Sequence, residues 1–164
     1  MELEEVKHKV NKSLEILYEK DKELFEFTTN DPLVSERCLT FRLGYYLQNE
    51  FIGYDVDSEY NRHIKNIKKI EDANVFPDLI IHKRLKDEHN LLWIEIKKKQ
   101  EDCKNDIRRL KEVTINEYLY KYGAMIILEK QKPKVFYYKN GNEVGSDKNV
   151  YWKSIRRYDN VVIR

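Results

Sequence analysis

The sequence predicts a mixed α/β domain in which helices flank a central sheet. Apolar residues recur at helical spacing in three segments, and short β-branched or aromatic runs fill the segments between them. The resulting order is helix, helix, three strands, helix, strand, strand. A helix between two strands is typical of a right-handed crossover, so we expect a mixed sheet with a crossover from the third strand to the fourth.

Two helices are predicted at the start of the chain. The first spans residues 2–25 and is amphipathic, with apolar positions at Val6, Val10, Leu14, Leu17 and Leu24. The segment TTNDP interrupts this pattern. Asp31 is expected to cap a second helix that has Pro32 at its first position. That helix runs to about Glu50, with apolar positions at Leu39, Leu43 and Leu47.

Strands are predicted for most of the remaining chain. Residues 52–60, 75–84 and 90–98 form three strand-like segments, which indicate a meander. A crossover helix follows, marked by Cys103, Ile107, Leu110 and Thr114, and the apolar run AMIIL begins the next strand after Gly123. The turn Asn140-Gly141 predicts a hairpin within residues 134–144. We assign further strands to the C-terminal part, 134–164, although its tail is hard to place.

Composition excludes several classes of protein. Charged residues make up 37% of the 164 residues and aromatic residues 12%, which is too aromatic for a disordered chain and too polar for a membrane protein. The longest apolar runs fall far below the roughly 18 residues of a membrane span, and no signal segment is seen. Cys38 and Cys103 lie outside metal-binding spacings. We therefore expect a soluble, cytoplasmic, single-domain protein.

Charged residues interrupt the apolar pattern at four positions. In LLWIEIKKK (91–99), Glu95 and Lys97 point to one face of the strand because side chains alternate. Asp78 follows Pro77 in the neighbouring strand, and Glu36 lies at the end of the apolar stripe of the second helix. Carboxylates that converge repel one another, and either proton uptake or a bound cation relieves the repulsion.

A hard cation fits this set of residues. Mg²⁺ prefers oxygen ligands and is typically held by one or two carboxylates, which Asp78 and Glu95 supply together with a backbone carbonyl. Lys97 would then face the attacking water or a phosphate oxygen. Such a site hydrolyses phosphodiesters.

The sequence PD, followed after a turn by EIK and preceded by a helical glutamate, resembles the PD-(D/E)xK nuclease superfamily and its small bacterial members. The resemblance covers residues 31–130 and implies a restriction-endonuclease-like fold with an added N-terminal helix and a core of about 31–139. It implies that Asp78, Glu95 and the Ile96 carbonyl ligate Mg²⁺, for which Mn²⁺ can substitute. Lys97 would position the nucleophilic water, and Glu36 would complete the site through water or a second metal.

The expected function is therefore a metal-dependent nuclease that acts on nucleic acid, DNA in preference to RNA. One alternative is a catalytically inactive module of the same fold that binds nucleic acid or protein, with its carboxylates paired to lysines. Another is a mixed-sheet domain whose charges form ordinary surface pairs. The net charge of +2 does not decide between them, because the basic clusters fit a phosphate-binding face and a solvated surface equally well. The oligomeric state stays open, with a homodimer among the alternatives.

Other candidate residues have more ordinary interpretations. Glu59 would supply a further site carboxylate or an anchor for Arg62, and a solvated strand end explains it equally well. His82 is expected to be packed or hydrogen-bonded rather than a ligand. An exposed helical face is the favoured interpretation for a third group, which contains Asp106, Arg108 and Arg109.

Overall fold

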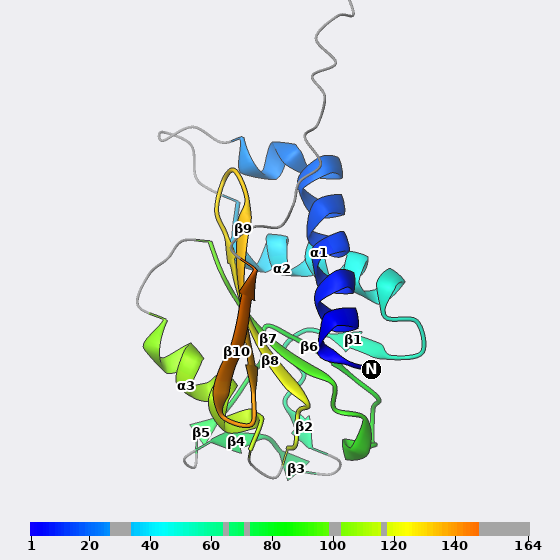
Figure 1. Ribbon diagram of the computed structural model, residues 1–164, viewed down its shortest axis with the longest axis vertical. Helices are drawn as coiled ribbons and strands as arrows, with labels where there is room; N and C mark the ends of the chain where they lie inside the picture. Colours follow the sequence, from blue (N-terminus) through cyan, green and yellow to red (C-terminus); the bar gives the residue numbers. More distant parts are fainter. Residues whose placement is uncertain (27–33, 64–65, 71–72, 99–102, 116–117, 148–164) are drawn as a thin grey trace, which may run out of the picture.

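A computed structural model describes residues 1–26, 34–63, 66–70, 73–98, 103–115 and 118–147 (Figure 1). Its centre is a six-stranded sheet with the order β1-β6-β7-β8-β9-β10. Its strands are β1 Asp55–Asp57, β6 Leu79–His82, β7 Leu92–Lys97, β8 Tyr122–Leu128, β9 Pro133–Lys139 and β10 Asn142–Asp147. Within this sheet β7 and β8 are parallel, and the other neighbouring strands are antiparallel. The predicted mixed sheet is confirmed.

Helices cover the two faces of the sheet (Figure 1). Helices α1 (Leu3–Lys20) and α2 (Glu36–Glu50) pack on one face, where the apolar cluster includes Leu14, Leu43 and Ile94. Helix α3 (Lys104–Val113) packs on the other face, over a cluster that includes Trp93. Because strand side chains alternate, β7 sends Leu92, Ile94 and Ile96 to the first cluster and Trp93 to the second.

The first predicted helix is shorter than expected. Helix α1 ends at Lys20, and a 3-10 helix, η1 (Lys22–Phe25), follows it. Asp21 leaves the helical conformation because α2 holds its side chain: the Arg42 guanidinium donates to both carboxylate oxygens, at 2.9 and 2.8 Å, and the Tyr46 hydroxyl donates at 2.8 Å. This ion pair ties the end of α1 to the middle of α2.

The predicted start of the second helix is wrong. Helix α2 begins at Glu36, and its N-cap is Ser35, whose hydroxyl accepts a hydrogen bond from the Cys38 amide at 3.2 Å. Asp31 and Pro32, the residues expected to start this helix, lie outside the described residues. Glu36 is consequently the first residue of the helix, and not part of its second turn.

The meander is confirmed, but its strands are shorter than predicted. Strand β1 occupies only three of the residues 52–60. Gly53 (φ 87°) and Glu59 (φ 50°) flank it, and their left-handed conformations end the extended chain on both sides. The crossover from β7 through α3 to a parallel β8 is confirmed. The β9–β10 hairpin is also confirmed, with Asn140 (φ 49°) and Gly141 (φ 74°) in its turn.

The short strands between β1 and β6 were not predicted. In the described part of this segment they form two separate pairs, β2 (Arg62–His63) with β3 (Asn66–Ile67) and β4 (Lys69–Ile70) with β5 (Ala73–Asn74). Between the pairs, the Lys68 side chain is buried against the α3 side of the sheet. Another 3-10 helix, η2 (Asp87–His89), joins β6 to β7.

Two further predictions concern the C-terminal strands and the absence of membrane-spanning helices. The C-terminal strands predicted over 134–164 are described as far as Asp147, and residues 148–164 lie outside the described part. Among the described helices, none has the length and apolar character that crossing a bilayer requires.

Candidate functional site

The sheet register brings Asp78 and Glu95 opposite each other. Leu79 of β6 pairs with Ile94 of β7 in the last pair of the antiparallel ladder, and Asp78 and Glu95 are the residues just beyond that pair on the two chains. Residues opposite each other in a sheet share a face. Lys97, two residues beyond Glu95, points to the same face. Glu95 and Lys97 lie on the α3 side of the sheet, where they contact Arg109 and Asp106. Asp78 lies beside them, hydrogen-bonded to the Ile96 amide.

The Glu95 carboxylate is almost fully buried, with 2% of the residue exposed. Its Oε1 atom accepts a hydrogen bond from the Trp93 indole Nε1 at 2.9 Å and lies 3.4 Å from the Arg109 guanidinium Nε. Burial raises the pKa of Glu95 to about 8, and the nearby Asp78 carboxylate adds to this effect against the opposing charge of Arg109. Burial therefore favours the protonated form of this carboxyl group.

Asp78 lies just before β6, and one of its oxygens is engaged by the neighbouring strand. The backbone amide of Ile96 donates to Asp78 Oδ2 at 2.7 Å. Burial raises the pKa of Asp78, although that hydrogen bond and the Lys97 charge oppose the shift. This hydrogen bond fixes Asp78 against β7, next to Ile96, whose carbonyl is a predicted metal ligand.

Lys97 is held by a residue of α3. Its ammonium Nζ lies 3.3 Å from Asp106 Oδ2, and Asp106 also accepts a hydrogen bond from Arg109. Burial alone would lower the pKa of Lys97, but the carboxylates of Asp106 and Glu36 outweigh it and raise the pKa. The ammonium therefore stays charged at neutral pH.

Glu36 approaches the same strand ends from α2. The Lys98 amide, just past the end of β7, donates to Glu36 Oε2 at 3.3 Å, and the Lys98 ammonium donates to the Val34 carbonyl at 3.1 Å. Burial raises the pKa of Glu36; the charge of Lys97 opposes this and that of Asp78 adds to it. The charges of Lys97 and Asp78 therefore act on Glu36, and its hydrogen bond in the described structure is with the Lys98 backbone amide.

A cavity of about 300 Å³ opens beside Asp78. It is lined by Glu36, Arg37, Thr40, Ser58, Glu59 and Asp78. Glu59 is fixed there by a hydrogen bond from its amide to the Pro77 carbonyl at 2.9 Å, and its carboxylate lies 3.5 Å from the exposed Arg37 guanidinium. The structure brings Glu59 to this cavity, whereas Arg62 is exposed on β2 and does not line it.

The expectation of an exposed charged face on α3 is wrong for two of its residues. Asp106 is buried and Arg109 is partly buried, because both contact charged residues of β7; Arg108 is exposed as expected. The sequence does contain a signal for this arrangement. Asp106, Leu110 and Val113 recur at helical spacing and form the buried stripe of α3, which places a carboxylate over the strand that carries Lys97.

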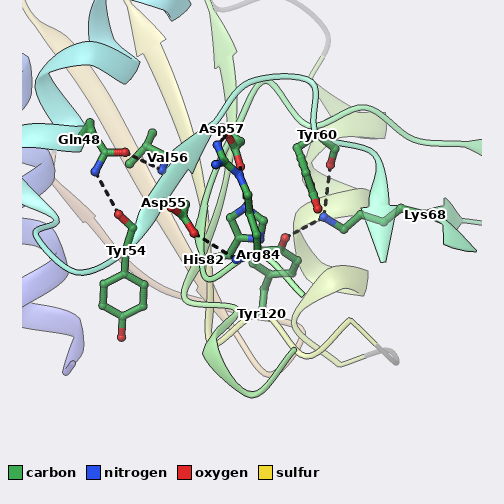
Figure 2. Close-up of polar contacts among 10 residues, drawn as sticks. All are labelled: Gln48, Tyr54, Asp55, Val56, Asp57, Tyr60, Lys68, His82, Arg84 and Tyr120. Atoms are coloured by element: carbon green, nitrogen blue, oxygen red, sulfur yellow. Dashed lines mark hydrogen bonds and ion pairs between the residues drawn. The ribbon is translucent and has the colours of Figure 1, made fainter. Parts of the chain in front are cut away.

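His82 is hydrogen-bonded, as predicted. Its Nε2 lies 2.9 Å from Asp57 Oδ2, and Nε2 must carry the proton because an ionised carboxylate can only accept. Figure 2 shows His82 and Arg84 converging on Asp57, with the Arg84 amide donating to Asp55 at 3.1 Å. This cluster fastens the edge strand β1 to β6 and to the turn after it.

Asp78 and Glu95 are the residues that could hold Mg²⁺. Within the described ranges, no group of three or more His, Cys, Asp and Glu side chains is placed to hold a metal ion. Mg²⁺ is usually held by one or two carboxylates and keeps several waters, so two carboxylates and a carbonyl are a sufficient set. The contacts described above engage Asp78 Oδ2 and Glu95 Oε1, which leaves the second oxygen of each carboxylate for a cation.

Comparisons with protein-family models and with curated proteins found no match to this chain. A function must therefore be inferred from the residues and their geometry.

Proposed function

We propose that this protein is a metal-dependent nuclease of the PD-(D/E)xK type that hydrolyses phosphodiester bonds in nucleic acid, DNA in preference to RNA. The observation that carries the proposal is the opposition of Asp78 and Glu95 on adjacent strands, with Lys97 on the same face. Proline before Asp78 and the Glu-x-Lys spacing on β7 complete the motif in its structural context.

The arrangement of the central elements also supports the proposal. Helix α2, the antiparallel strands β1, β6 and β7, helix α3 and the parallel strand β8 follow one another in the order that the resemblance implies for a restriction-endonuclease-like core. In this interpretation α1 is an addition before the core, and the β2–β5 segment is an insertion between its first two strands.

Each site residue has a role in this proposal. Asp78 and Glu95 would hold Mg²⁺ together with the Ile96 carbonyl. When bound, the ion would polarise the phosphoryl oxygen, shield its charge and lower the pKa of water. The charged Lys97 ammonium has three donors, so it can keep its contact with Asp106 while it orients the attacking water and stabilises charge on the phosphate. Glu36, next to the cavity, would complete the site through water.

One observation favours a second candidate function, an inactive module of the same fold that binds nucleic acid or protein. Both Glu95 and Lys97 already have charged partners within the protein, Arg109 and Asp106 respectively. An inactive site would keep both pairs permanently, whereas an active one must release Arg109 from Glu95 so that metal can bind.

Cleavage assays with the purified full chain test the proposal. We expect Mg²⁺- or Mn²⁺-dependent cleavage of nucleic acid, and a loss of at least about a hundredfold in Glu95→Gln, because a charged group acting on the transition state is removed while its shape is kept. Lys97→Met should abolish turnover but leave calorimetric metal binding largely intact. Lys97→Arg should not fully rescue turnover, because a planar guanidinium does not replace a compact ammonium.

Glu88→Gln is the matched control, because Glu88 is exposed in η2, at the opposite ends of β6 and β7. It should cleave like the unaltered protein. If the unaltered protein cleaves neither single- nor double-stranded DNA or RNA with either metal, the nuclease proposal is wrong. If Glu95→Gln also increases the stability of the protein, the inactive module is the function that remains.

A further inference from the structure

Arg109 lies between two carboxylates, those of Asp106 and Glu95. Its NH2 group donates a hydrogen bond to Asp106 on its own helix, one turn before it, and its Nε lies 3.4 Å from Glu95 Oε1 on β7. The Arg109 side chain is 28% exposed, and that of Glu95 is only 3% exposed. The guanidinium therefore reaches from the surface of α3 down to the buried carboxylate.

The two contacts of Arg109 differ in kind. The contact with Asp106 is a hydrogen-bonded ion pair between residues three apart on a helix. The contact with Glu95 is an ion pair without a hydrogen bond, since Arg109 Nε is among the buried atoms that have no hydrogen-bond partner within the described structure. A buried donor without a partner is unfavourable, so the Glu95 side of the contact is the weaker one.

Arg109 is also the charged partner of Glu95. The Trp93 indole, which contacts the same oxygen, Oε1, at 2.9 Å, is a neutral donor. Lys97 is the cation nearest to Glu95 along β7, but it is paired with Asp106. Among the described residues, Arg109 is thus the cation in contact with this buried carboxylate.

We propose that Arg109 is an internal competitor of the divalent cation: its guanidinium lies against Glu95 Oε1, where the ion would bind, and must withdraw from it when metal binds. After the Arg109 guanidinium leaves Glu95, its hydrogen bond to Asp106 keeps it beside the site. There its positive charge can bind a phosphate group of the substrate. This inference rests on the proposed function, since it assumes that Glu95 is a metal ligand. It identifies Arg109 as a residue that sets the metal affinity of the site.

The test is calorimetric titration of MgCl₂ and MnCl₂ into the full-length protein, Arg109→Met and Arg108→Met at one ionic strength. Arg108 is the matched control because it is the adjacent arginine of α3 and is exposed. Removal of a positive charge within about 4 Å of a ligand should strengthen metal binding markedly, so we expect about tenfold tighter binding in Arg109→Met. Arg108→Met, which changes the net charge equally, should stay within about twofold of the unaltered protein because an exposed charge is screened.

A second measurement does not depend on the folding of a variant. In the unaltered protein, Mg²⁺ titration followed by NMR should shift both the Trp93 Nε1–H and the Arg109 Nε–H resonances, because both groups lie against Glu95 Oε1. A shift of the Trp93 resonance with no change at Arg109 would mean that metal binds without displacing the guanidinium, which overturns the inference.

The outcomes separate this inference from the proposed function. If the unaltered protein binds metal and Arg109→Met binds it no more tightly than Arg108→Met, Arg109 is not a competitor, but the nuclease proposal stands. If neither the unaltered protein nor folded Arg109→Met binds metal at millimolar concentration, the metal site itself is wrong and both proposals fail.

Discussion

Asp57 and Glu95 are two carboxylates with opposite behaviour, and their hydrogen-bond donors explain the difference. Burial alone would raise the pKa of Asp57, but hydrogen bonds from Arg84 and His82 outweigh it and hold the pKa below its usual value. Glu95 receives one neutral donor and one loosely placed guanidinium, so burial dominates and its pKa rises to about 8. The first pattern is that of a structural ion pair. The second is that of a carboxyl group whose charge is poorly compensated, so that burial favours its protonated form.

The lowered pKa of Asp57 predicts a pH-dependent contribution to stability. A carboxyl group with a depressed pKa stabilises the folded state above its unfolded pKa of about 3.9, and this contribution is lost as the pH falls through the folded value. Asp57→Asn should therefore lower the free energy of unfolding at pH 7 by about 2 kcal/mol, the scale of hydrogen bonds to a charged group. The difference from the unaltered protein should shrink steadily below about pH 4.

Urea denaturation at several pH values measures this difference. Glu88→Gln serves as the control, because it also removes one carboxylate but from an exposed position in η2, and it should show no such trend. A penalty for Asp57→Asn that stays constant from pH 7 to pH 3 would contradict the structural ion pair.

Several individual site residues were predictable from the sequence because strand geometry is regular. The two-residue period put Glu95 and Lys97 on one face, and the pairing of adjacent strands placed Asp78 beside them. Arg109 was not predicted as a site residue. Its role depends on how α3 is rotated above the sheet, and the apolar residues Ile107 and Leu110 alone do not fix that rotation.

At the scale of elements, the β2–β5 segment is attached to the sheet by a buried cation. The Lys68 ammonium donates to the Tyr120 hydroxyl at 2.9 Å and to the Tyr60 carbonyl at 3.3 Å, as Figure 2 shows. It also lies 5.2 to 5.5 Å from the ring centroids of Tyr60, Trp93 and Tyr120. Strands of two residues have no recognisable sequence period, and this cage is assembled from distant positions, so the sequence did not predict it.

Lys68→Ala should therefore loosen the segment. A desolvated cation–π contact contributes about 2 kcal/mol, so we expect a loss of about 2 kcal/mol in the free energy of unfolding, with faster hydrogen exchange in residues 66–70. The control is Lys69→Ala, because the Lys69 side chain is exposed, and it should change stability by less than about 0.5 kcal/mol. Equal effects of the two substitutions would mean that the cage does not hold the segment.

At the scale of the whole molecule, the site depends on the layers of the fold. Helix α2 supplies Glu36 from one face of the sheet, and α3 supplies Asp106 and Arg109 from the other, so both helices meet the same end of β6 and β7. The order of elements and the parallel crossover were predictable, because each has a local sequence pattern. The start of α2 at Glu36 was not, because Asp31-Pro32 is also a plausible start signal and only the structure shows that Ser35 caps the helix.

The most direct test of the metal site is a crystal structure of the protein soaked in Mn²⁺, with anomalous diffraction recorded to locate the ion. We predict an anomalous peak between the carboxylates of Asp78 and Glu95, with ligand distances of about 2.1 Å, and the Arg109 guanidinium withdrawn from Glu95. A structure in which Mn²⁺ is absent from this position, while Arg109 still contacts Glu95, would contradict the proposed site.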